Sequence, residues 1–148
     1  LCRELAGQVY NSHVSLAEGL TEFLDELALH KIPAGVASSS PKEGIRMVLR
    51  RFGLEGRFAV VSSADDTGVS KPDPAIYILA AKLAGADPKN CVAVEDSETG
   101  LRSALAAGMH CLAYRNGFND EQDLSLANAE IRGFKELGIA RLTRLLSR

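Results

Sequence analysis

Two adjacent carboxylates, Glu95 and Asp96, follow the apolar run at residues 91–94 and precede a helix-like segment. The run is typical of a buried strand, and in an open α/β sheet ligands bind at the carboxyl ends of the strands. Carboxylate oxygens there suit Mg²⁺, which commonly takes one or two carboxylates with water and phosphate oxygens. The structural alternative is that Asp96 and Ser97 only cap the next helix.

Three serines, Ser38, Ser39 and Ser40, end another strand-like run just before Pro41. Hydroxyls and unpaired backbone amides at the start of a helix suit a phosphate group. Ser40 to Glu43 also fits a capping box with Pro41 at the first helical position. We therefore interpret Ser40 as a cap, whereas Ser38, at the strand end, is a candidate for either role.

Lys71 precedes a turn that contains Pro72 and Pro74. The two prolines limit backbone freedom and help to aim the lysine. Its ammonium group would neutralise phosphoryl oxygens if it faced the same site. The alternative is a solvated loop lysine. Asp73 and Pro74 are predicted to be the cap and the first residue of the next helix.

The elements that position these residues alternate along the chain. We predict strands at residues 32–37, 58–61, 91–94 and 109–114, with a weak one near Ile131. Helices are expected near residues 23–30, 45–52, 76–83 (ended by Gly85), 101–107 and 137–146, several of them with apolar residues at i, i+3, i+4 and i+7. Asp65-Asp66 is expected to be a polar turn and residues 116–128 loop-rich. This order predicts a parallel sheet covered by helices on both faces.

Composition narrows the class of protein. The length of 148 residues fits one domain, and a net charge of −2 gives no basic surface for nucleic acid. No apolar run reaches membrane-spanning length and no signal peptide is recognised, so no membrane partner is expected. The three cysteines have no metal-ligand spacing, which favours a reduced, cytoplasmic setting.

The three motifs, in this order, resemble the haloacid dehalogenase-like hydrolase superfamily, and most closely the branch of β-phosphoglucomutase and sugar-phosphate or phosphoglycolate phosphatases. The similarity covers roughly residues 14–140. It implies a Rossmann-like, doubly wound α/β core. It also implies that Ser38, with Ser39, binds the phosphoryl group, that Lys71 offsets its charge, and that Asp96 and Glu95 hold Mg²⁺. The reaction would pass through an aspartyl-phosphate.

The chain departs from this pattern at the nucleophile. The family places it in an Asp-x-Asp motif on the first strand, but no Asp-x-Asp occurs here, and Asp25 is the only aspartate before Ser38. We therefore expect an N-terminally truncated chain, with residues 1–14 as the remnant of a helical cap and residues 15–148 as a partial core. The missing strand is central in the family. Its loss predicts a gap, or a direct pairing of the strands that end at Ser38 and Glu95, and low stability.

These observations predict the C-terminal part of a Mg²⁺-dependent phosphohydrolase that acts on a small phosphorylated metabolite and is inactive by itself. Two alternatives stay open. One is a non-catalytic module that binds phosphate or metal, or an interaction protein, on the same scaffold. The other is a phosphomutase of the same branch.

Overall fold

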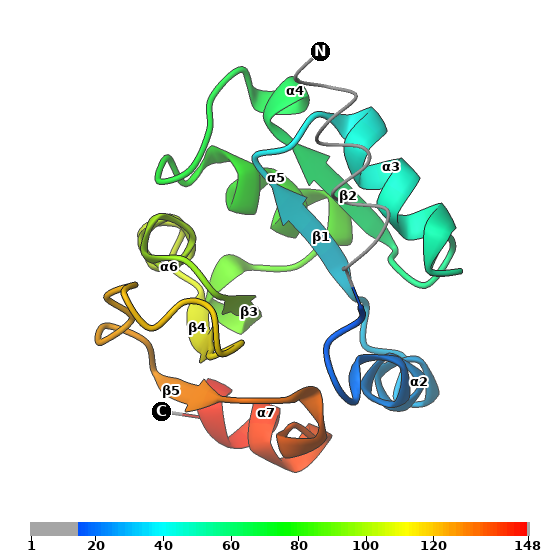
Figure 1. The fold of residues 1–148 in the computed structure, drawn as a ribbon, viewed down its shortest axis with the longest axis vertical. Helices are drawn as coiled ribbons and strands as arrows, with labels where there is room; N and C mark the ends of the chain where they lie inside the picture. The colour runs from blue at the N-terminus through cyan, green and yellow to red at the C-terminus, as the bar shows by residue number, and fades with distance from the viewer. Residues whose placement is uncertain (1–14, 148) are drawn as a thin grey trace.

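Parallel strands in two separate groups form the centre of the molecule (Figure 1). The computed structural model describes residues 15–147. In the first group β1 (Gly35–Ser38) pairs with β2 (Val60–Ser63). In the second, β4 (His110–Tyr114) lies between β3 (Val92–Glu95) and β5 (Ala129–Ile131). Each strand ends close to its predicted position, and the α/β architecture with parallel strands is confirmed.

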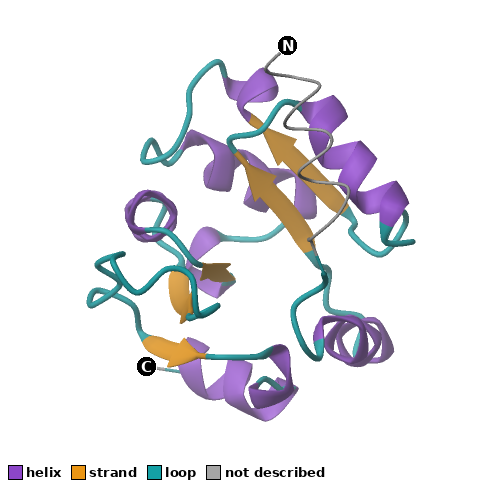
Figure 2. Cartoon of the chain, viewed as in Figure 1, coloured by secondary structure: helices purple, strands orange, loops and turns teal. Residues whose placement is uncertain are grey.

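Helices follow the strands and cover both faces of the sheets (Figure 2). They are α2 (Leu20–Leu29), α3 (Lys42–Arg51), α4 (Ala64–Thr67), α5 (Ala75–Ala84), α6 (Glu98–Ala106) and α7 (Ile139–Leu146), with 3-10 turns at Pro88–Asn90 and Phe134–Glu136. Gly85 ends α5 in the left-handed conformation, as predicted. Among residues 15–147, no helix combines the length and the apolar character needed to cross a membrane.

Strand β4 shows how the pleat divides the core. Its residue Leu112 packs in a cluster with α2, α3 and α7, whereas Cys111 and Ala113 pack in a second cluster with α5 and α6. Successive side chains of a strand point to opposite faces, so a strand buried on both sides is apolar throughout. This explains why residues 109–114 show no polar alternation.

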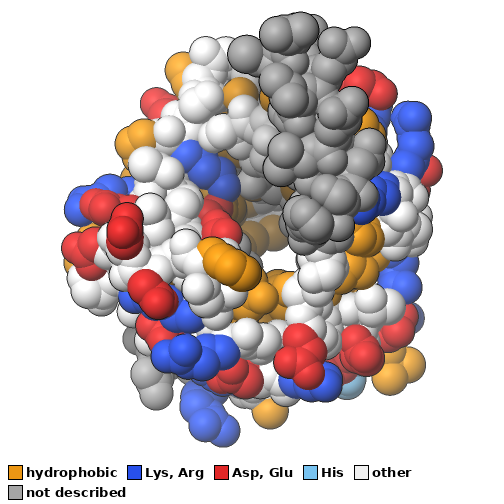
Figure 3. Space-filling model, in the orientation of Figure 1, with side chains coloured by type: hydrophobic (Ala, Val, Ile, Leu, Met, Phe, Trp, Pro, Cys, Tyr) orange, Lys and Arg blue, Asp and Glu red, His pale blue; other side chains and the backbone are white. Residues whose placement is uncertain are grey.

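A gap separates β1 from β3. Within the described part of the chain these two strands do not pair with each other, and a cavity of about 540 Å³ lies between them. Val36 of β1 and Val92 and Val94 of β3 line it and are only half-buried. Figure 3 shows this face hollowed, with hydrophobic side chains around the hollow. The predicted gap is confirmed, whereas the predicted cap remnant, residues 1–14, lies outside the described residues.

The predicted Ser40 cap of α3 and the predicted polar turn at Asp65-Asp66 are both wrong, because these two aspartates form a short helix that contacts the start of α3. Helix α3 begins at Lys42 without a side-chain cap from Ser40, because the Lys42 amide donates to Asp65 Oδ2 at 2.7 Å instead. Asp65 and Asp66 are not a simple turn. They lie in the short helix α4, where Ser63 and Asp66 form a capping box. Asp66 also pairs with the Lys42 ammonium at 2.6 Å, which joins the start of α3 to the end of β2.

Candidate active site

Lys71 connects the two groups of strands at their carboxyl edge. Its backbone amide donates to Ser39 Oγ at 3.2 Å, just beyond the end of β1. Its ammonium group pairs with Glu95, the last residue of β3. The lysine is therefore not a solvated loop residue, because only 12% of its side chain is exposed. The sequence prediction that Lys71 is aimed at this edge agrees with the geometry.

The Glu95 carboxylate is buried and receives two donors on one oxygen. The Lys71 ammonium and the Tyr77 hydroxyl both donate to Oε1. The lysine nitrogen also lies 4.8 Å from the centre of the Tyr77 ring, within the range of a cation–π contact. Burial, and then the charge of Glu95, raise the pKa of Tyr77, so its hydroxyl stays protonated and remains a donor.

Gly100 of α6 gives this carboxylate its space. A Cβ added at Gly100 would lie 2.7 Å from Glu95 Oε1 and closer still to Oε2. Ser97 caps the same helix by accepting from the Gly100 amide at 3.1 Å. Ser97 therefore caps the helix, as the structural alternative stated, and a side chain at position 100 would overlap the Glu95 carboxylate.

Asp96 follows the last residue of β3 and differs from Glu95 in its exposure and its partners. It is exposed, and its Oδ2 accepts from Asn116 Nδ2 at 3.1 Å. The buried Asn119 donates from Nδ2 to the Asp96 carbonyl at 2.7 Å and to the Tyr114 carbonyl at 2.8 Å. The loop after β4 thus holds Asp96 through both its side chain and its backbone.

Ser38 ends β1 at the same edge, opposite Ser63 in the parallel register. Its Oγ accepts from the Ser40 amide at 3.1 Å, which shapes the turn into α3. Ser38 is half-buried, and Ser39 and Ser40 are exposed. Ser38, Ser39, Lys71 and Glu95 thus lie at the strand ends on either side of the gap, with Asp96 directly after β3.

Sequence reasoning misses three residues of this site. Tyr77 follows Ile76 in the helix pattern and carries no polar signal of its own in the sequence. Asn116 and Asn119 fall in a polar segment whose composition indicates only a loop. Their contacts with Asp96 form because the loop after β4 passes the end of β3, and local sequence patterns do not predict that path.

The donor set is compatible with part of a magnesium shell. Asp96 offers an exposed carboxylate, and Mg²⁺ binds through one or two carboxylates completed by water and substrate phosphate. The part of the chain that the structure describes holds no cluster of three or more His, Cys, Asp or Glu side chains suited to a metal. The described residues therefore fit a cation only as contributors to a shell that other groups complete.

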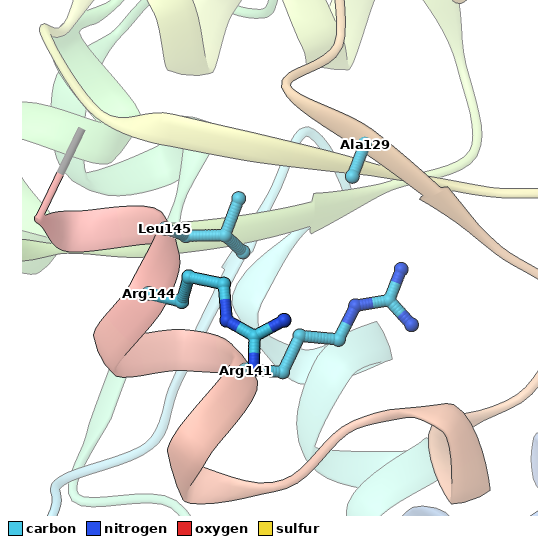
Figure 4. Close-up of a pocket in the computed structure, with 4 residues that line it drawn as sticks. All are labelled: Ala129, Arg141, Arg144 and Leu145. Carbon is cyan, nitrogen blue, oxygen red and sulfur yellow. The ribbon is translucent and has the colours of Figure 1, made fainter.

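A second pocket, of about 360 Å³, lies between α7 and β5. Ala129, Arg141, Arg144 and Leu145 line it (Figure 4). The Arg141 guanidinium donates to the Glu136 and Glu130 carbonyls at 3.0 and 3.1 Å. Arg141 thus links α7 to the backbone at Glu130 and Glu136, and it brings no group to the carboxyl edge of the strands.

Comparison with known proteins identifies the family of the chain. Residues 1–114 match the family model described as haloacid dehalogenase-like hydrolase. The chain is 34% identical over 116 residues to the CBBY-like protein of Arabidopsis thaliana, covering 77% of this chain and 36% of that protein. It is 33% identical over 144 residues to hexitol phosphatase B of Escherichia coli O157:H7, covering 91% of this chain and 64% of that protein.

Among solved structures, a mutant of CbbY from Rhodobacter sphaeroides, in complex with xylulose-(1,5)bisphosphate, superposes with a TM-score of 0.83. It is 28% identical, and the match covers 92% of this chain and 62% of that one. Because the family model matches more than half of the chain, the chain belongs to the haloacid dehalogenase-like hydrolase family. It spans less than two thirds of the length of each of these three proteins.

Proposed function

We propose that this chain is the phosphate-binding and charge-balancing part of a Mg²⁺-dependent phosphohydrolase for small phosphate monoesters of the sugar-phosphate type. The observation that supports the proposal is that Lys71 contacts both Ser39, next to Ser38, and Glu95, next to Asp96, at one edge of the gap. The name of hexitol phosphatase B points to the same substrate class.

In this proposal each residue has one task. Ser38 donates its hydroxyl to a phosphoryl oxygen, with Ser39 beside it, and Lys71 balances the phosphoryl charge. Asp96, with Glu95 as the second proposed ligand, would hold Mg²⁺, which supplies Lewis-acid stabilisation of the phosphoryl oxygens when bound. Glu95 can take part through Oε2, which lies beside Gly100, because Oε1 already accepts from Lys71 and Tyr77.

The nucleophile is proposed to come from a strand that enters the gap between β1 and β3. Both strands present unpaired edges there within the described residues, and the cavity between them is lined largely by apolar side chains. A strand parallel to both would place its carboxyl end beside Lys71. Without that strand the chain should bind phosphate weakly and hydrolyse nothing, because Glu95 is held by Lys71 and Tyr77 and cannot serve as the nucleophile.

Phosphate binding tests the first half of the proposal. Calorimetric titration with inorganic phosphate should give weak binding that Lys71→Ala or Ser38→Ala reduces by about tenfold, as expected for the loss of a charged or hydrogen-bonding partner. Lys82→Ala, on the last turn of α5, is the matched control and should bind like the parent chain. Equal binding by all four proteins would contradict the proposed site.

Strand addition tests the second half. A peptide with an apolar strand followed by an Asp-x-Asp sequence should raise the melting temperature and produce Mg²⁺-dependent hydrolysis of sugar phosphates. The same peptide with Asn for both Asp should still stabilise the chain but give no turnover. Hydrolysis by the chain without peptide, abolished by Asp96→Asn, would show that the proposed inactivity is wrong. Binding of phosphate without turnover in every mixture would favour the non-catalytic module.

A further inference from the structure

Three elements converge on the Glu95 carboxylate, and one of the contributing residues has no role in the function proposed above. Lys71 comes from the loop before α5, Glu95 from the end of β3, and Tyr77 from the first turn of α5. We name these residues the Lys71–Glu95–Tyr77 triad. Tyr77 is given no phosphate contact there: it is 7% exposed, packs in the cluster of α5, α6 and β4, and lines the cavity between β1 and β3.

We propose that Tyr77 is a positioning residue, whose hydroxyl holds Glu95 on the Lys71 ammonium and so keeps the lysine at the edge of the gap. The inference deepens the proposed function, on which its link to phosphate rests. Its geometric part concerns only contacts within this chain.

The tyrosine is suited to this task because its own position is fixed. It is buried in one cluster with Ala81 and Ala93, which limits the movement of its ring. The hydroxyl donates to Glu95 Oε1, and it also lies 3.3 Å from the Lys71 nitrogen. The centre of the ring lies 4.8 Å from the same nitrogen. Tyr77 therefore acts on Lys71 both directly and through Glu95.

The Glu95 carboxylate is confined on the side of α6. Helix α6 lies against its other oxygen, because Gly100 leaves only the space of a hydrogen there. Ser97 Oγ lies 3.5 Å from that oxygen. A Glu95 held in this way gives Lys71 a fixed partner, whereas a free lysine has a flexible four-carbon stem that must be ordered before it can bind an anion.

Chemical labelling of the lysine measures this directly. Trace acetylation followed by mass spectrometry gives the rate at which the Lys71 amine reacts, with the exposed Lys82 as internal reference. Lys71 should react at least about tenfold more slowly than Lys82, since only 12% of its side chain is exposed and its nitrogen contacts Glu95 and Tyr77. Tyr77→Phe keeps the ring but removes the donor, and should raise the Lys71 rate about threefold to tenfold.

The matched control is Tyr114→Phe, since the Tyr114 ring packs against Phe134 and its hydroxyl makes no hydrogen bond with the described part of the chain. This variant should leave the Lys71 rate unchanged. In a Glu95→Gln background, Tyr77→Phe should add less than half of its effect, because residues that act through one another are not additive. An unchanged Lys71 rate in Tyr77→Phe, or a full effect in the Glu95→Gln background, would overturn the proposal.

A second measurement needs no variant. A hydroxyl proton donated to a buried carboxylate should exchange slowly with water and give its own downfield NMR signal, and fast exchange at Tyr77 would contradict the proposal. Labelling and exchange do not involve phosphate. If they respond as expected while inorganic phosphate does not bind, the positioning role stands and the proposed function fails.

Discussion

At the scale of single residues, Asn119 has more partners than its sequence context suggests. Its amide nitrogen donates to two backbone carbonyls, Asp96 at 2.7 Å and Tyr114 at 2.8 Å, and its Oδ1 accepts from the Asn116 amide at 3.1 Å. It is 8% exposed, so water cannot replace these bonds freely. One side chain therefore joins the end of β3 to the end of β4 and fixes the backbone that carries Asp96.

Asn119→Ala should lower the free energy of unfolding by about 1–3 kcal/mol, because it leaves buried polar groups unpaired. Urea unfolding followed by circular dichroism measures the change. Asn90→Ala is the control, since the exposed Asn90 side chain makes no hydrogen bond with the described residues, and it should change stability by less than about 0.5 kcal/mol. Equal losses in the two variants would mean that the Asn119 network adds no stability.

At the scale of elements, two helices carry a glycine at the same position with opposite surroundings. Gly100 is the third residue of α6, and Gly44 is the third residue of α3. A Cβ at Gly100 would overlap the Glu95 carboxylate, whereas a Cβ at Gly44 would meet nothing within 4 Å. Comparing alanine substitutions at the two glycines separates the cost of crowding Glu95 from the general preference of helices for alanine.

Gly100→Ala should destabilise the chain by about 1–3 kcal/mol, because the carboxylate must move off Lys71 and Tyr77 or the helix must shift. Gly44→Ala should stabilise it by about 0.5–1 kcal/mol, since alanine is the better helix former. Thermal unfolding of both variants gives the comparison. A stabilising Gly100→Ala would show that the Glu95 carboxylate is free to relocate without cost.

The elements themselves are largely predictable from sequence, and the reason lies in their periodicity. The helix with Ile45 and Leu49 and the apolar strand before Glu95 follow from local patterns, and Gly85 marks a helix end. The start of α3 is not predictable, because Asp65, 23 residues after Lys42, takes the capping role expected of Ser40. The same holds for Tyr77 and Asn119, whose partners lie on other elements.

At the scale of the whole molecule, the gap beside β3 makes stability depend on what fills it. The facing edges of β1 and β3 are unpaired within the described residues, and Val36, Val92 and Val94, which line the gap, are only half-buried. A central strand would cover this apolar surface and pair both edges. Low stability of the chain alone therefore remains a prediction. Testing it requires a residue near the gap, inside the core, whose reactivity reports opening of the protein.

Cys111 is such a residue. Burial, and then the nearby charge of Glu95, raise its pKa to about 12, and its side chain is fully buried on β4. Because the raised pKa keeps the proton in the folded state, the folded chain holds a proton that the unfolded chain releases above about pH 8.5. Stability from this group is therefore present at neutral pH and is lost as pH rises from about 8.5 towards 12.

Since only the thiolate reacts, Cys111 should exchange with a disulfide reagent at pH 8 only when the protein opens. In a chain with Cys2 and Cys91 replaced by serine, the exchange rate should be slow and should rise steeply with urea. The half-buried Cys91, measured in a variant with Cys2 and Cys111 replaced by serine, should react faster because the reagent reaches it without opening of the core. Addition of the strand peptide should slow Cys111 further, because a filled gap stabilises the closed chain. Exchange of Cys111 as fast as that of Cys91, and unchanged by the peptide, would show that the core beside β3 is open whether or not the gap is filled.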